Sequence, residues 1–375
     1  MVVSAPAAEV IDALLCSDLR GEASPWPWST ETSVDAAFAR ARMHGVVALL
    51  HAQPHARGWP RRFVELCRAE AQALAMWELR HESVLRDTLF ALDQAGLQPL
   101  LIKGAALAYS FYADPAQRTR SDSDLFMPVN ARDATERTLH RLGFERVASA
   151  PSHQATYVLQ QPDATSHALD VHWRINNSES LARLLPYDEV ARDAQPVPAL
   201  GPHALAPSPV YALVIACMHR ATHRHNPYRV AGESHHEPDR LIWLRDIDLL
   251  ARTLGEAQWR EFVSIATSKG LPATCLEGLQ LAARCFHTPL PEDAIAALSA
   301  SSGRADRYLQ SSPLRQHWLD FVALQSATAR VRWLKDVALP PEPYMRAKYP
   351  DGGHLPWLYL RRAARGMAKR LRPRL

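Results

Sequence analysis

Residues 97–127 read LQPLLIKGAALAYSFYADPAQRTRSDSDLFM, and this stretch decides the fold. The apolar run at 100–102 predicts a strand, and Lys103-Gly104 predicts a tight turn that opens a short helix. A second strand is expected at SDSDLFM, which soon turns apolar. The rest of the chain is expected to wrap around this strand–turn–helix–strand unit.

Three aspartates are the first candidates for chemistry. Asp122 and Asp124 are two positions apart, so on a strand they project from the same face. Close like charges repel, and a hard divalent cation with oxygen ligands compensates them. Asp170, in ALDVHW at 168–173, is expected on a later strand and would complete a site for one or two Mg²⁺. The alternative is three solvated surface aspartates, the usual state of acidic residues.

The turn before the first pair has features of a phosphate cradle. A strand that ends in glycine and opens a helix can present backbone N–H groups to phosphate. Gly104 lets the backbone approach closely, and Lys103 adds a cation. A phosphate cradle followed by carboxylates is what metal-dependent nucleotidyl transfer requires. The alternative is a plain strand-to-helix turn.

The order of these motifs resembles the uncharacterised nucleotidyltransferase family of bacteria, a branch of the polymerase-β-like nucleotidyltransferase superfamily. The resemblance runs from about Val47 through the segment that ends near Asp246, and more weakly beyond. In two respects the chain departs from the superfamily: Gly104-Ala105 replaces a Gly-Ser turn, and the gap to Asp122 is longer. The residues that carry the resemblance are Lys103, Gly104, Arg118, Asp122, Asp124, Leu142, Gly143, Phe144, Asp170, His172 and Trp173, with Cys217-Met218-His219 and Arg240–Asp246 later on.

The resemblance implies an α+β fold with three parts. A small mixed-sheet nucleotidyltransferase core is expected over residues 96–205. N-terminal helices over 1–95 and a C-terminal helical domain with a basic tail over 206–375 would flank it.

The function that the resemblance implies is transfer of a nucleoside monophosphate from an NTP to an unknown acceptor hydroxyl or phosphate. The expected roles are metal binding and catalysis by Asp122, Asp124 and Asp170, and binding of the triphosphate by Lys103, Gly104, Arg118 and Arg120. Two other classes stay open. One is a non-catalytic nucleotide-binding or regulatory protein with the same fold, and the other is a membrane-surface assembly partner that acts through the basic tail.

Composition sets broad bounds. The chain has 375 residues and a formal charge of +4, too mild by itself to indicate nucleic acid. Its five cysteines have no C-x-x-C spacing, which favours reduced thiols. The first residues lack a basic signal-peptide region, and no apolar run has the length of a membrane span. These patterns predict a cytoplasmic protein, with the tail as a route to the inner membrane surface.

Helical periodicity fills most of the remaining chain. A long helix is expected over 60–94 with a break near Arg80, and Asn130 is the expected N-cap of a helix over 131–142. A loop or small hairpin is expected over 193–209 and a mobile loop over 224–238. Further helices are predicted over 5–20, from Ser33, from Pro209, and over 239–254, 256–269, 271–287, 291–300 and 312–335.

Two later patterns leave alternatives open. His219 and His223 are one helical turn apart, which suits packing or substrate contact better than zinc, because no glutamate follows His219. The last residues are basic and interleaved with Trp357 and Leu360, and no acidic residue follows Asp351. Such a helix can contact an anionic membrane or nucleic acid, or it can simply be a solvated helix end.

Overall fold

The computed structural model describes residues 7–53, 58–149, 152–224, 226–230, 232–349 and 352–371, the last seven of them by backbone alone. Within these residues the centre is a mixed sheet in the order β3-β4-β5-β2-β1-β7-β6. Its strands are β1 Leu100–Ile102, β2 Asp122–Phe126, β3 Glu145–Arg146, β4 Gln154–Gln160, β5 Ser166–His172, β6 Gln195–Pro196 and β7 Leu205–Ala206.

The middle of this sheet brings distant parts of the chain together. β2 pairs antiparallel with β1 and parallel with β5. The parallel register places Asp124 directly opposite Asp170. The hairpin expected over 193–209 is present, because β6 pairs with β7, which adds to β1.

Helices cover both faces of the sheet, as strand alternation requires. Leu101 and Leu125 share a core cluster with Leu85 of α4, on one face. Leu100 and Ile102 belong to a second cluster on the other face, built mainly from the C-terminal helices. The helices between the sheet strands are α5 Lys103–Phe111, α6 Arg132–Arg141 and α7 Tyr187–Ala191. The 3₁₀ turns η2 Pro115–Gln117, η3 Val129–Ala131 and η4 Pro198–Leu200 complete this region.

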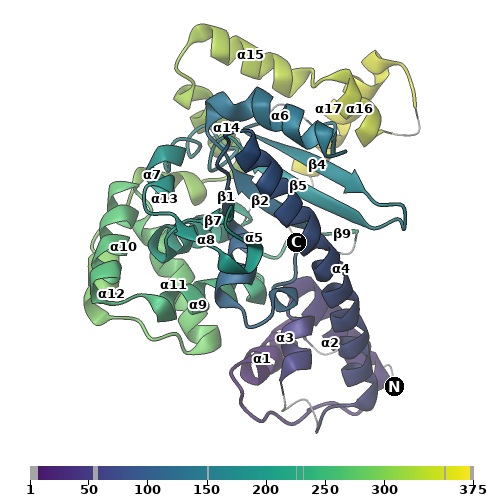
Figure 1. The fold of residues 1–375 in the computed structure, drawn as a ribbon, viewed down its shortest axis with the longest axis vertical. Helices are drawn as coiled ribbons and strands as arrows, with labels where there is room; N and C mark the ends of the chain where they lie inside the picture. The colour runs from purple at the N-terminus through teal and green to yellow at the C-terminus, as the bar shows by residue number, and fades with distance from the viewer. Residues whose placement is uncertain are drawn as a thin grey trace.

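The N-terminal region is helical, with α1 Ala8–Leu19, α2 Glu31–His44, α3 Val47–Ala52 and α4 Arg61–Gln94. Figure 1 shows α4 as one long ribbon that leaves the N-terminal helices and runs along the sheet. The break predicted near Arg80 is wrong. Glu78 and His81 on either side of it are buried and hydrogen-bonded to the core, which holds the helix continuous there.

The C-terminal helices form two groups, which Figure 1 shows in green and yellow. The first group shares the large core cluster with the sheet, whereas α14 and α15 bury none of their side chains. The groups are α8 Pro209–Thr222, α9 Leu241–Thr253, α10 Glu256–Ser268, α11 Pro272–Phe286, α12 Glu292–Ser299 and α13 Arg304–Leu309, then α14 Pro313–Ala323, α15 Ala327–Ala338, α16 Glu342–Lys348 and α17 Leu355–Leu371.

Three local predictions were wrong. Residues 129–131 form a 3₁₀ turn, so α6 begins after Ala131 without the Asn130 cap. The helix predicted over 312–335 is two helices, because Ser326 caps α15 through the Ala329 N–H. The segment predicted as a loop over 224–238 contains a hairpin of β8 Tyr228–Val230 and β9 Glu233–His235. Among the described residues, no helix has the length and apolarity needed to cross a membrane.

Candidate active site

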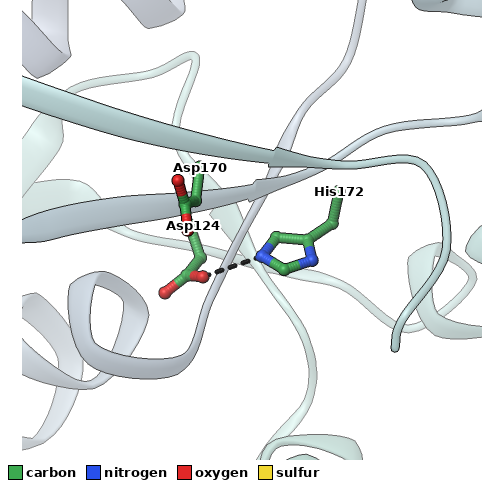
Figure 2. A group of neighbouring side chains, drawn as sticks. All are labelled: Asp124, Asp170 and His172. Atoms are coloured by element: carbon green, nitrogen blue, oxygen red, sulfur yellow. Dashed lines mark hydrogen bonds and ion pairs between the residues drawn. The ribbon is translucent and has the colours of Figure 1, made fainter. Parts of the chain in front are cut away.

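Asp124 and Asp170 lie side by side on neighbouring strands, and His172 follows on the strand of Asp170 (Figure 2). One potential ligand atom from each residue lies within 4.8 Å of the other two. The described residues contain no other group of three or more such side chains so close together. The sequence predicted one site for Asp122, Asp124 and Asp170. The structure brings Asp124 and Asp170 together with His172, and Asp122 is not part of this three-residue group.

Lys103 completes the charge arrangement. Its Nζ donates a hydrogen bond of 2.6 Å to Asp124 Oδ1 and lies 3.1 Å from His172 Nε2. His172 Nε2 lies 2.8 Å from the same Asp124 oxygen, within hydrogen-bond distance. Lys103 has a φ of 52°, in the left-handed region that costs a non-glycine residue about 1–3 kcal/mol. The turn thus stores strain at the residue whose ammonium contacts the carboxylate.

The electrostatics of the group follow from burial and these contacts. Burial alone would raise the pKa of Asp124, but the charge of Lys103 and the hydrogen bond from His172 outweigh it and leave that pKa below its usual value. Burial and the charge of Lys103 lower the pKa of His172, so the imidazole is neutral at pH 7 and suited to ligate a metal. Burial and the charge of Asp124 raise the pKa of Asp170, although Thr156 donates to it at 2.6 Å.

Asp122 stands at the start of β2 and lines the same cavity, outside the three-residue group. Burial, together with the charges of Asp124 and Asp170, raises the pKa of Asp122 to about 7. A carboxylate whose ionisation is opposed by its neighbours favours a bound cation. Two carboxylates and one imidazole, with Asp122 beside them, are a donor set that fits a divalent metal such as Mg²⁺ or Mn²⁺.

His172 is a potential ligand that sequence reasoning did not assign. Its position two residues after Asp170 placed it on the same face of the strand, and that spacing was the available signal. What the spacing did not show is that His172 reaches across to Asp124 on the neighbouring strand.

Gly104 lies in the first turn of α5, as predicted. It lines the cavity together with Lys103 and Asp122. The first N–H groups of a helix have no partner within the helix, so they face a ligand or solvent. A Cβ at Gly104 would lie 3.4 Å from the guanidinium of Arg118, which packs against this turn.

Arg118 is buried and uses its guanidinium within the protein. Its Nε and Nη2 donate to the carboxylate of Asp246 at 2.7–3.0 Å, and Nη1 donates to the Thr119 carbonyl at 2.8 Å. Tyr112 donates to the same carboxylate. Arg118 therefore ties the loop before β2 to α9, while it also borders the cavity.

Arg120 retains unused donors. Its Nη2 donates to Glu78 at 2.6 Å, and the guanidinium lies over the rings of Trp77 and Tyr109. Its Nε and Nη1 are buried and make no hydrogen bond to the described residues. Arg120 lines the cavity, so its positive charge acts on an anionic ligand bound there, although these two N–H groups are covered by protein.

All these side chains border one cavity of about 860 Å³. The cavity lining also includes Trp243 and two histidines, His219 and His223, whose ring centroids lie 4.7 Å apart. Neither histidine belongs to a potential metal group among the described residues. The cavity is within the size range of sites for nucleotide-sized ligands.

A sheet with paired carboxylates on adjacent strands and a glycine turn before them defines a nucleotidyltransferase-like protein. The family described as uncharacterised nucleotidyltransferase matches residues 30–287, and the chain belongs to this family. The α+β fold with a mixed sheet and many helices is likewise confirmed.

The chain was also compared with curated proteins and with solved structures. No curated protein matches the chain. Among solved structures, an antigenic nucleotidyltransferase-like protein from Paracoccidioides brasiliensis is similar at 15% identity and a TM-score of 0.36. The similarity covers 57% of this chain and 95% of that one.

Proposed function

We propose that the protein transfers a nucleoside monophosphate from an NTP to an acceptor hydroxyl or phosphate, with a divalent metal. The observation that supports this most strongly is the close group of Asp124, Asp170 and His172 beside Lys103. Family membership supports the same class of reaction.

Asp124, Asp170 and His172, with Asp122 beside them, would hold the metal. When bound, a divalent ion neutralises phosphate charge and polarises the phosphorus–oxygen bonds. Phosphoryl-type transfer depends mainly on such positioning and charge stabilisation.

The remaining residues act on the triphosphate and the acceptor. The backbone N–H groups at Gly104 and the ammonium of Lys103 bind phosphate oxygens, and the guanidinium charge of Arg120 neutralises developing negative charge. Arg118 holds the loop in place through Asp246 rather than by direct charge. Asp170, whose pKa is raised by burial and by Asp124, accepts the proton of the acceptor hydroxyl. The acceptor oxygen bonds to the α-phosphorus, and pyrophosphate leaves with the electrons of the broken bond.

The test is incubation with each α-labelled NTP, Mg²⁺ or Mn²⁺, and cell extract. Transfer of label with release of pyrophosphate is expected. Asp124→Asn should abolish both, whereas Asp133→Asn, an exposed acid on α6, should change neither. Nucleotide binding without transfer under every condition would instead indicate the non-catalytic class, and no binding at all would overturn the proposal.

We also propose that α17 contacts an anionic lipid surface. Trp357 and Leu360 are 61% and 63% exposed, next to Arg361 and Arg362. An amphipathic basic helix of this kind lies in a membrane interface.

Binding to anionic vesicles should weaken strongly with salt and be lost when residues 357–375 are deleted, while label transfer persists. Salt-insensitive or absent binding would remove the idea. The side chains of residues 365–375 lie outside those that the structure describes.

A further inference from the structure

Part of the cavity lining is built of rings. It consists of His219 on α8, His223 at the C-terminal cap of α8, Tyr228 on β8 and Trp243 on α9, here called the ring wall. His223 stacks on Trp243 with ring centroids 4.9 Å apart, and Tyr228 meets the same indole edge-on at 5.1 Å. Four rings from three elements thus form one continuous surface.

This surface carries no negative charge. The acidic residues among the described lining of the cavity are Glu70, Asp122, Asp124 and Asp170, and none belongs to α8, β8 or α9. Burial, with the charge of Lys103, lowers the pKa of His223 to about 4, so this imidazole is neutral at pH 7. The ring wall is suited to a flat, uncharged ligand rather than to a metal or phosphate.

A cation lies over two of the rings and also borders the cavity. The guanidinium of Arg240 lies 5.3 Å from the centre of the Tyr228 ring and 5.5 Å from that of Trp243. Its Nε donates to the Met43 carbonyl at 2.7 Å, which fixes its position. A cation over aromatic faces orders the rings before any ligand arrives.

The ring wall begins next to the phosphate turn. Lys103, His219 and Trp243 together border a smaller hollow that adjoins the main cavity. A triphosphate held at Lys103 and Gly104 would therefore leave its nucleoside end near the rings.

We propose that the ring wall binds the nucleobase of the NTP, an inference that rests on the proposed function. A flat base matches these rings, which border the same cavity as Lys103 and Gly104. Stacking of a base on aromatic side chains strengthens binding by roughly tenfold or more.

The test compares ligands that share the triphosphate and differ in the base. Calorimetry would measure Mg²⁺-dependent binding of ATP, GTP, CTP, UTP and inorganic tripolyphosphate. Wild-type protein should bind at least one NTP about tenfold more tightly than tripolyphosphate. Trp243→Leu should remove this difference and leave tripolyphosphate binding unchanged. His223→Ala is the second variant, because Trp243 is buried and its replacement can unfold the protein.

The matched control is Trp318→Leu on α14, where the indole is 61% exposed and outside the cavity. It should bind every ligand as wild type does. Equal binding of NTPs and tripolyphosphate by wild type, or full NTP preference in His223→Ala and Trp243→Leu, would overturn the ring-wall proposal alone. Failure to bind any of these ligands would overturn the proposed function as well. Weaker use of the acceptor with unchanged NTP affinity would assign the rings to the acceptor instead.

Discussion

The two sides of the cavity are built on different principles. The charged side comes from β2, β5 and the first turn of α5, elements that the sheet places next to one another. The ring wall comes from α8, β8 and α9, which are brought together by tertiary packing and not by a shared sheet. The charged side is held by ion pairs and strand register, and the ring wall by stacking. The comparison teaches that removing one charge should disable the charged side, whereas removing one ring should only weaken binding at the ring wall.

The largest effect is expected from Asp124→Asn. The change keeps the shape and removes a charged ligand, so Mg²⁺-dependent turnover should fall by about 10²-fold or more. His223→Ala should retain most of the turnover at saturating NTP, because stacking contributes mainly to binding. Steady-state kinetics of pyrophosphate release would measure both variants. Equal losses in the two would contradict the division between the sides.

The next effect concerns the ion pair that joins the two sides. Arg118 and Asp246 are both about 95% buried, and removing one partner leaves an uncompensated buried charge. Arg118→Met should lower the free energy of unfolding by about 3–5 kcal/mol. Urea unfolding would measure it, and Arg118→Met/Asp246→Leu should recover part of the loss.

The matched control is Arg61→Met, which removes an exposed ion pair with Glu65 on α4. Its unfolding midpoint should stay at the wild-type value, because exposed pairs contribute little. A midpoint for Arg118→Met that also stays unchanged would show that the two sides are held together by something else.

Asp122→Asn should stabilise the metal-free protein. The pKa of Asp122 is raised to about 7 in the folded state, so folding disfavours its charge, and stability falls as pH rises from about 4 to 7. Replacing the carboxyl should raise the free energy of unfolding by about 1–3 kcal/mol at pH 8 and flatten that pH dependence. Thermal melts with EDTA would show it. Adding Mg²⁺ should reverse the order of the two proteins. A lower melting temperature for Asp122→Asn than for wild type in EDTA would contradict the repulsion between Asp122 and the carboxylates of Asp124 and Asp170.

These expectations show how far the sequence could lead. The i, i+2 pattern predicted that Asp122 and Asp124 would share a face, because strand geometry places alternate residues on one side. The motif order predicted that Asp170 would join them, and the structure brings Asp170 beside Asp124 but leaves Asp122 outside that close group. The same pattern did not assign His172, because its contact with Asp124 depends on which strand lies beside β5.

Tertiary packing decided the remaining differences. The sequence placed His219 and His223 one helical turn apart. It could not show that both rings contact the indole of Trp243, which lies on another helix. The continuous α4 overrode an expected break, since buried hydrogen bonds at Glu78 and His81 are long-range and do not appear in local propensity.

The smallest effect concerns the support of the ring wall. Asp12 accepts hydrogen bonds from Arg40 and His44, and His44 Nδ1 accepts from the N–H of Leu241, where α9 begins. Burial raises the pKa of Asp12, but the bonds from Arg40 and His44 outweigh it and lower the value to about 2. The stability from this group is present above about pH 4 and is lost as pH falls toward 2.

Asp12→Asn should therefore lose less stability than wild type between pH 4 and 2.5, by about 1 kcal/mol. Urea unfolding at the two pH values would measure the difference. Glu9→Gln, an exposed acid on the same helix, should behave as wild type. Identical slopes for Asp12→Asn and wild type would mean that the network does not hold α9.

The 34 residues of α4 span about 50 Å, and the helix takes part in two hydrophobic cores. Phe63 packs with the N-terminal helices, and Leu89 packs under the sheet. Because one continuous helix packs in both cores, a rotation of the N-terminal helices relative to the sheet requires α4 to bend. Near its middle, Glu78 holds Arg120 at the cavity. A displacement of the N-terminal helices would therefore move Arg120, whose guanidinium borders the same cavity as the carboxylates.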